Sequence, residues 1–307
     1  MRFPIPAALG DRHGHAGGGD YASRASASRG GGAFLSPVRT LRKIAAFFRR
    51  DFAIARGYRG ALVLETVEAL FGVATFFYLS RFVESQQLER ALPAGSNYFS
   101  FALVGFAFFD YLSVALSAFD SSIEEARQNR TLEALLVTQT PLTVILAGSA
   151  AYPFVALALR TCVYLGWGAL FFGFLPRTAN WPGAALILAA SILAFAGLGV
   201  LSASYQILFK RGNPAKWVVL GVSGLVGGMM YPVAVLPGPL QLLARFIPVT
   251  YSLAGMRAAL LAGAGWSGLW HPLVALLIFA AVLIPISFAV FGWALRRTKV
   301  TGTLTHI

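Results

Sequence analysis

Long apolar runs constrain the fold of this chain more than any other feature of its sequence. Several runs of about twenty residues or more are almost entirely apolar, which is the length a helix needs to cross a bilayer. Hydrophobic residues make up 57% of the chain and charged residues only 12%, whereas soluble domains are about 25% charged. The sequence therefore predicts an all-α integral membrane protein.

Six apolar segments are expected to span the membrane. The third has 34 residues and would be about 50 Å long as a helix. It must therefore tilt, kink near Pro153 or project beyond the hydrocarbon core. The predicted segments are Ala61–Val83, Asn97–Phe119, Leu142–Leu175, Gly183–Phe209, Trp217–Leu236 and His271–Leu295.

The basic residues indicate how the segments are oriented. The net charge is +13, which in a soluble protein would suggest nucleic acid as a partner. Here the Lys and Arg residues lie in short stretches between apolar runs. Fifteen fall on the side that carries both termini and five on the other. The positive-inside rule then predicts a multi-pass protein of the plasma membrane with both termini cytoplasmic, and no nucleic-acid partner.

The amino-terminal part differs in composition from the rest. Residues 1–36 hold eight glycines with Ser, Ala and Arg, which predicts a disordered basic tail before a membrane domain at 37–307. Within that domain, Val38–Arg59 carries seven Lys and Arg, with apolar residues at helical spacing. This pattern is typical of an interfacial amphipathic helix, and a cytosolic docking helix is the alternative.

A charged stretch, Asp120–Pro141, follows the second apolar segment. Ser121 and Ser122 each precede a glutamate at capping-box spacing, so a new helix can begin there, or the second membrane helix can run on. From Leu132 to about Thr138 a short amphipathic helix is expected, with three leucines on one face. So short a helix needs a partner surface, either the membrane or a groove of another protein.

A segment rich in Pro and Gly separates the last two apolar runs. Two short amphipathic helices are expected in it, Pro239–Ile247 and Thr250–Leu261. Irregular backbone at membrane depth requires cover by protein or a water-filled cavity. The segment is therefore predicted to form a re-entrant or external hairpin on the outer side.

Four charged residues lie inside predicted membrane segments, where charge is costly. They can form ion pairs between helices or line a polar translocation path; chemistry on a substrate is a third possibility. No catalytic constellation and no metal-ligand spacing accompanies them. The residues are Glu65, Glu68, Asp110 and Arg160.

Two stretches resemble motifs of the type-2 ATP-binding-cassette (ABC) permeases that export drugs, lipids or polysaccharides. EEARQNRTLEALLVTQTP is similar to an acidic–basic cluster followed by G-T-L-E-x-L-L-x-T-P, with Asn129–Arg130 where glycine is usual. YPVAVLPGPLQLLARFIPVTYSLAGMRAALLAG resembles a second block, F/Y-P-x-x-x-L-P…P-x-T-Y…R-x-x-L-x-G. The matching residues of this outer hairpin motif include Tyr231, Pro232, Pro237, Pro248, Tyr251 and Arg257.

This resemblance implies six helices per subunit and two subunits per pore, either as a homodimer or with a related permease. It also implies that the first motif is a coupling helix that docks on an ABC ATPase, present in two copies. The chain lacks G-x-x-x-x-G-K-[ST], so ATP and Mg are expected in the partner and no cofactor in this chain. The implied docking residues are Glu124, Glu125, Arg127, Arg130, Thr131, Leu132, Glu133, Leu135 and Leu136.

The leading hypothesis is a permease subunit of an ATP-driven exporter, which is not an enzyme by itself. Its aromatic-rich helices, with 25 Phe in the chain, suggest an amphipathic or lipid-like substrate. One alternative is a membrane enzyme that acts on lipid through Glu65, Glu68 or Asp110. The other is a non-transporting assembly subunit.

Overall fold

The computed structural model describes most of the predicted membrane domain and no strand within it. The predicted tail, 1–36, and the predicted coupling helix lie outside the described residues, all of which belong to one unit, Leu41–Ile307. The described residues are 45–46, 48–50, 52–53, 57, 59–83, 92, 97–128, 142–174, 176, 178–209 and 213–300.

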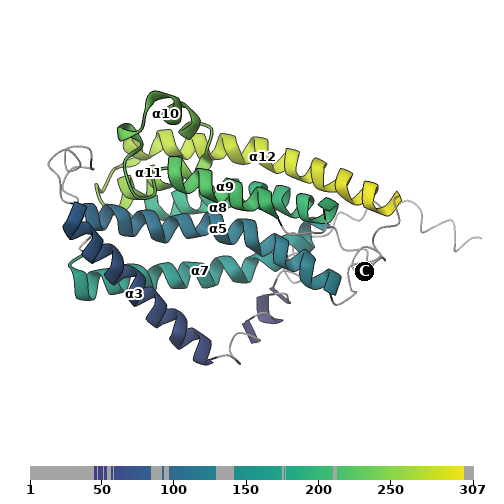
Figure 1. The fold of residues 1–307 in the computed structure, drawn as a ribbon, viewed down its shortest axis with the longest axis horizontal. Helices are drawn as coiled ribbons and strands as arrows, with labels where there is room; N and C mark the ends of the chain where they lie inside the picture. The colour runs from purple at the N-terminus through teal and green to yellow at the C-terminus, as the bar shows by residue number, and fades with distance from the viewer. Residues whose placement is uncertain are drawn as a thin grey trace, which may run out of the picture. The chain divides into compact units, whose positions relative to one another are not determined.

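Five of the described helices are long and apolar enough to cross a membrane, which confirms the predicted all-α membrane class. In Figure 1, α5, α7, α8 and α12 run alongside one another, while α3 lies at an angle to them. Helix α8 packs against α12 and α5, and α7 packs against α5 and α3. The helices are α3 (Arg59–Val83), α5 (Tyr98–Gln128), α7 (Leu142–Phe172), α8 (Trp181–Phe209) and α12 (Trp266–Val300).

The contact between α5 and α8 depends on a small residue. A side chain at Gly199 of α8 would overlap the carbonyl oxygen of Ala115 and the ring of Phe119, both on α5. Small residues let helix backbones approach closely in a membrane, where there is no hydrophobic force to drive helices together. Gly199 therefore sets the distance between the two helices at the centre of the bundle.

Helix α5 is longer than the predicted second span, because it continues without a break through Gln128. The capping-box interpretation of Ser121 and Ser122 is therefore wrong, and the alternative, that the membrane helix runs on, is confirmed. Helix α7 continues through Pro153 without a break. Its candidate span is Ala150–Phe172, and how its excess length is accommodated in the membrane stays a prediction.

The fifth predicted segment is only partly helical. Helix α9 (Pro214–Val226) has 13 residues, or about 20 Å of helix, which is less than the ~30 Å hydrocarbon core. The chain then turns at Gly228, whose φ of 83° suits glycine, and reaches a 3₁₀ turn, η1 (Val233–Val235). Six spans thus remain a prediction: five helices have the required length, and α9 is apolar but short.

The two short helices of the predicted hairpin are confirmed. They are α10 (Gly238–Ala244) and α11 (Pro248–Leu260), which precede α12. The end of the bundle at which α3 ends, α5 begins and these two helices lie is called the hairpin end (Figure 1). The opposite end is where α5 ends and α7 begins.

The predicted interfacial helix is described only in part. Its described residues, which fall between 45 and 57, are helical. The ring of Phe48 lies 6.3 Å from that of Phe52 and 6.0 Å from that of Tyr152 on α7. An aromatic contact therefore ties this segment to the start of the α7 span, while its place at the lipid surface remains a prediction.

We expect Gly199→Ala to lower the thermal stability of the purified protein, because the added methyl group pushes α5 and α8 apart. Overpacking of this kind costs about 1–3 kcal/mol. Gly166→Ala is the matched control, since Gly166 is helical and nothing lies within 4 Å of its Cβ position. Thermal unfolding in detergent measures both, and equal melting temperatures for the two variants would contradict the close contact.

Candidate functional site

The predicted intramembrane charges come together where α3, α5 and α7 meet. Arg160 Nη2 lies 3.4 Å from Glu68 Oε1, and Arg160 Nε donates a hydrogen bond to the Tyr164 hydroxyl at 2.9 Å. Asp110 is half-buried and lies within electrostatic reach of both Arg160 and Glu68. The structure thus joins three of the four predicted residues across three helices.

The exposure of this cluster decides what can cover it. The Glu68 side chain is 66% exposed and the Arg160 side chain 31%, so the pair lies on the surface of the single chain. Such charges do not face lipid without a large cost. A second protein chain or a water-filled path must therefore cover the α3–α7 face in the membrane. Glu65, one turn before Glu68, is exposed and forms no ion pair with a described residue.

A buried arginine organises the hairpin end. Arg257 of α11 is 5% exposed and donates to the carbonyl oxygens of Phe101, Gly228 and Met229, at 2.6–3.2 Å. Its Cζ also lies 3.4 Å from the centroid of the Phe101 ring. One side chain therefore connects α11 to the first turns of α5 and to the turn after α9.

Burial lowers the pKa of Arg257 to about 9. This value stays above neutral pH, so the guanidinium keeps its charge and all its donors. Gly105 provides the space, since a Cβ there would overlap both Arg257 and the Met229 carbonyl. Arg257 lies outside the five candidate spans, and its partners are backbone carbonyls, so its role is to hold the hairpin end together.

The other residues of the outer hairpin motif shape the backbone around Arg257. The Tyr231 hydroxyl donates to the Leu225 carbonyl, and the Tyr251 hydroxyl donates to the Arg245 carbonyl at 3.1 Å. The prolines lie at helix starts: Pro232 and Pro237 are the N-caps of η1 and α10, and Pro248 is the first residue of α11. These contacts give the residues of the motif a structural role at the hairpin end.

A second polar network lies at the opposite end and was not predicted. Asp120 Oδ2 accepts hydrogen bonds from Ser202 Oγ at 3.0 Å and from Asn213 Nδ2 at 2.9 Å. Asn213 Nδ2 also donates to the Ser202 hydroxyl and carbonyl oxygens. All three residues are at most 9% exposed. The end of α5 is thereby fixed to the end of α8 and to the start of α9.

The network continues one turn further along both helices. Gln206 Nε2 of α8 donates to Glu124 Oε2 of α5 at 3.3 Å. Asn213 also caps α9, because its Oδ1 accepts from the Lys216 N–H at 3.0 Å. Of the predicted docking residues, Glu124 therefore belongs to this network, and Glu125 and Arg127 lie in the last turns of α5. The predicted residues from Arg130 to Leu136 lie outside the described part.

The comparison with known proteins identifies the family. A profile described as ABC-2 family transporter protein matches residues 79–289, more than half of the chain. The chain belongs to the ABC-2 family of transporters.

Curated relatives agree with this assignment. The chain is 28% identical over 164 residues to the protein named inner membrane transport permease YadH of Escherichia coli K12. The counterparts in Escherichia coli O157:H7 and Shigella flexneri match equally well. Each match covers 53% of this chain and 63% of the relative, so the chain spans less than two thirds of the length of these curated relatives. The family match and the five candidate spans make this chain a multi-pass membrane protein of the ABC-2 family.

Some residues of the second network carried a signal in the sequence. Asn213–Pro214 is an N-cap followed by proline, which marks a helix start. No local sequence pattern indicates that Asp120 pairs with Ser202 and Asn213. These residues lie 82 and 93 positions further along this ABC-2 chain.

We expect Arg257→Met to destabilise the protein by several kcal/mol, because it leaves three buried carbonyl groups without their donors and each costs about 1–3 kcal/mol. Arg245→Met is the control, since Arg245 is exposed and contributes its backbone carbonyl to the contact with Tyr251. Thermal unfolding in detergent separates the two. A melting temperature that falls no further for Arg257→Met than for the control would show that the clamp is not needed.

Proposed function

We propose that this chain is the membrane-spanning subunit of an ATP-driven exporter of the inner membrane, with both termini cytoplasmic. A separate ABC ATPase, in two copies, binds ATP and Mg and docks at residues 124–136. A second permease copy, identical or related, completes the pore. The family match supports the class of transporter, and the aromatic-rich spans favour an amphipathic or lipid-like substrate.

One observation carries this proposal: α5 is a single helix from the hairpin end to Gln128. The predicted coupling helix follows it directly in the sequence. A force applied at residues 129–141 acts on the end of α5. Through Asp120 and Asn213 it also acts on α8 and α9. The chain therefore has a rigid path from the docking segment to the far side of the bundle.

The α3–α7 face supports a pore with two permease chains. Its ion pair, Arg160 with Glu68, requires cover by water or by protein. A second permease copy that encloses a polar path would cover the ion pair with protein on one side and water on the other. This is the role we assign to Glu68, Asp110 and Arg160, while Glu65 lies nearer the end of the path.

Docking is tested by the double variant Leu135→Asp with Leu136→Asp, co-expressed with the proposed ABC ATPase partner. Charge on the predicted leucine face should abolish co-purification and the stimulation of ATP hydrolysis, because it prevents burial of that face. Val137→Asp is the control, since Val137 falls on another face of the same short helix. If co-purification and stimulation survive in the double variant, the docking proposal is wrong.

The role of the ion pair is tested by a cycle of Arg160→Gln, Glu68→Gln and the double variant. For a translocation path, each single variant should reduce transport at least about tenfold with little change in stability, and the double variant should not restore it. For a purely structural pair, each single variant should lower the melting temperature and the double variant should recover it. Transport in proteoliposomes and thermal unfolding measure the two outcomes, and the second would contradict the path.

A further inference from the structure

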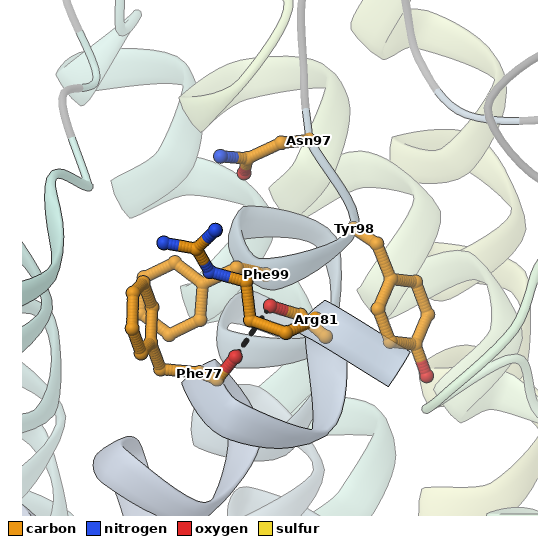
Figure 2. A pocket seen from close by; sticks show the side chains of 6 residues that line it. Phe77, Arg81, Asn97, Tyr98 and Phe99 are labelled. Carbon is orange, nitrogen blue, oxygen red and sulfur yellow. Dashed lines mark hydrogen bonds between the residues drawn. The ribbon is translucent and has the colours of Figure 1, made fainter. Parts of the chain in front are cut away.

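A small pocket opens at the hairpin end between the end of α3 and the start of α5 (Figure 2). Its volume is about 190 Å³, room for a phosphate group and the atoms attached to it. The pocket belongs neither to the ion pair of the α3–α7 face nor to the Arg257 clamp. It is lined by Phe77, Ser80, Arg81, Asn97, Tyr98 and Phe99.

The pocket contains hydrogen-bond donors that have no acceptor among the described residues. Arg81 makes no hydrogen bond or ion pair with a described residue, and its guanidinium lies over the Phe77 ring, 5.3 Å from Cζ to centroid. Asn97 Oδ1 accepts from the Ser100 N–H at 2.9 Å. Its amide nitrogen is therefore left to donate elsewhere.

These two donor groups lie on the same side of the pocket. In Figure 2 the guanidinium of Arg81 and the side-chain amide of Asn97 extend toward one side, while Tyr98 turns away from them. The rings of Phe77 and Phe99 pack edge to face, with centroids 5.5 Å apart, and form the wall beneath. An arginine fork with an added amide donor suits the oxygens of a phosphate group.

The depth of the pocket indicates where such a phosphate comes from. Arg81 is the next-to-last residue of the first candidate span, and Tyr98 is the first residue of the second. The pocket therefore lies where both helices leave the hydrocarbon core, at the level of lipid headgroups. Beside it, Tyr78 is 64% exposed and Phe82 88% exposed, and aromatic side chains of this kind contact lipid at the interface.

We propose that Arg81 and Asn97 form a binding site for the phosphodiester headgroup of an anionic membrane lipid. The guanidinium contacts two phosphate oxygens, and the Asn97 amide donates to one of them. The exposed Tyr78 and Phe82 pack against the acyl chains. This site adds a lipid contact to the permease that does not depend on the identity of its substrate or on its ATPase partner.

The test uses the full-length chain in detergent and native mass spectrometry with added phosphatidylglycerol or phosphatidylcholine. The unaltered protein should bind phosphatidylglycerol more tightly, because the single positive charge favours a headgroup without a choline cation. Arg81→Gln should weaken phosphatidylglycerol binding about tenfold, the scale of a charge-assisted contact, and remove the preference. Arg245 is an exposed arginine at the same end of the bundle. Arg245→Gln should leave the phosphatidylglycerol affinity and the preference over phosphatidylcholine unchanged.

A second variant separates binding from folding. Asn97→Asp keeps an oxygen acceptor for the Ser100 N–H, so the cap of α5 is preserved, but it replaces the donor amide by a negative charge. It should fold normally and lose the phosphatidylglycerol preference. The proposal is overturned if Arg81→Gln and Asn97→Asp bind phosphatidylglycerol as tightly as the unaltered protein does. It is also overturned if Arg245→Gln loses as much phosphatidylglycerol affinity as Arg81→Gln.

Inorganic phosphate distinguishes a lipid from a free anion. The apolar contacts of the acyl chains should make phosphatidylglycerol the tighter ligand, so equimolar phosphate should not displace it. Displacement at equal concentration would show a site for a small free anion and would overturn the assignment to lipid.

Discussion

A buried carboxylate with two hydrogen-bond donors holds three helices at one end of this permease. Asp120 on α5, Ser202 on α8 and Asn213 before α9 are almost fully removed from solvent. Both hydrogen bonds are accepted by Asp120 Oδ2, while the buried Oδ1 has no partner among the described residues. Loss of these two bonds would leave the whole carboxylate buried and unpaired, which is costly, so they hold the three helix ends together. The same asparagine starts α9 by capping it, and the position of this short helix therefore depends on the network.

Helix α5 is fixed at its other end by Arg257. The guanidinium binds the Phe101 carbonyl and the turn after α9, so both ends of α5 are tied to both ends of α9. Close packing at Gly199 also joins α5 to α8. In the proposed exporter, α5 acts as a rod that moves together with α8 and α9 when an ATPase pushes on residues 129–141. The exposed ion pair on α3 and α7 lies outside this rigid group, on a face that needs cover.

Local pattern was enough to predict the features that depend on local chemistry. Apolar length predicted the long helices, and an amphipathic pattern predicted the two short helices of the hairpin. Rare charges in apolar runs indicated ion pairs between helices as one possibility, and the structure pairs Arg160 with Glu68. The path of the chain at Ser121 could not be decided, because a capping-box spacing is equally compatible with the interior of a continuous helix. The Asp120 network was missed because it depends on contacts between residues 82 and 93 positions apart, and no local periodicity records these.

The central claim is that force on the docking segment reaches the bundle through Asp120. Its most direct test is the ATP hydrolysis rate of the permease–ATPase complex carrying Asp120→Leu, reconstituted in proteoliposomes. This variant keeps the approximate size of the side chain but has no oxygen to accept the hydrogen bonds of Asn213 and Ser202. The account predicts a complex that still assembles but in which the permease no longer stimulates ATP hydrolysis. Unchanged stimulation in an intact complex would contradict it.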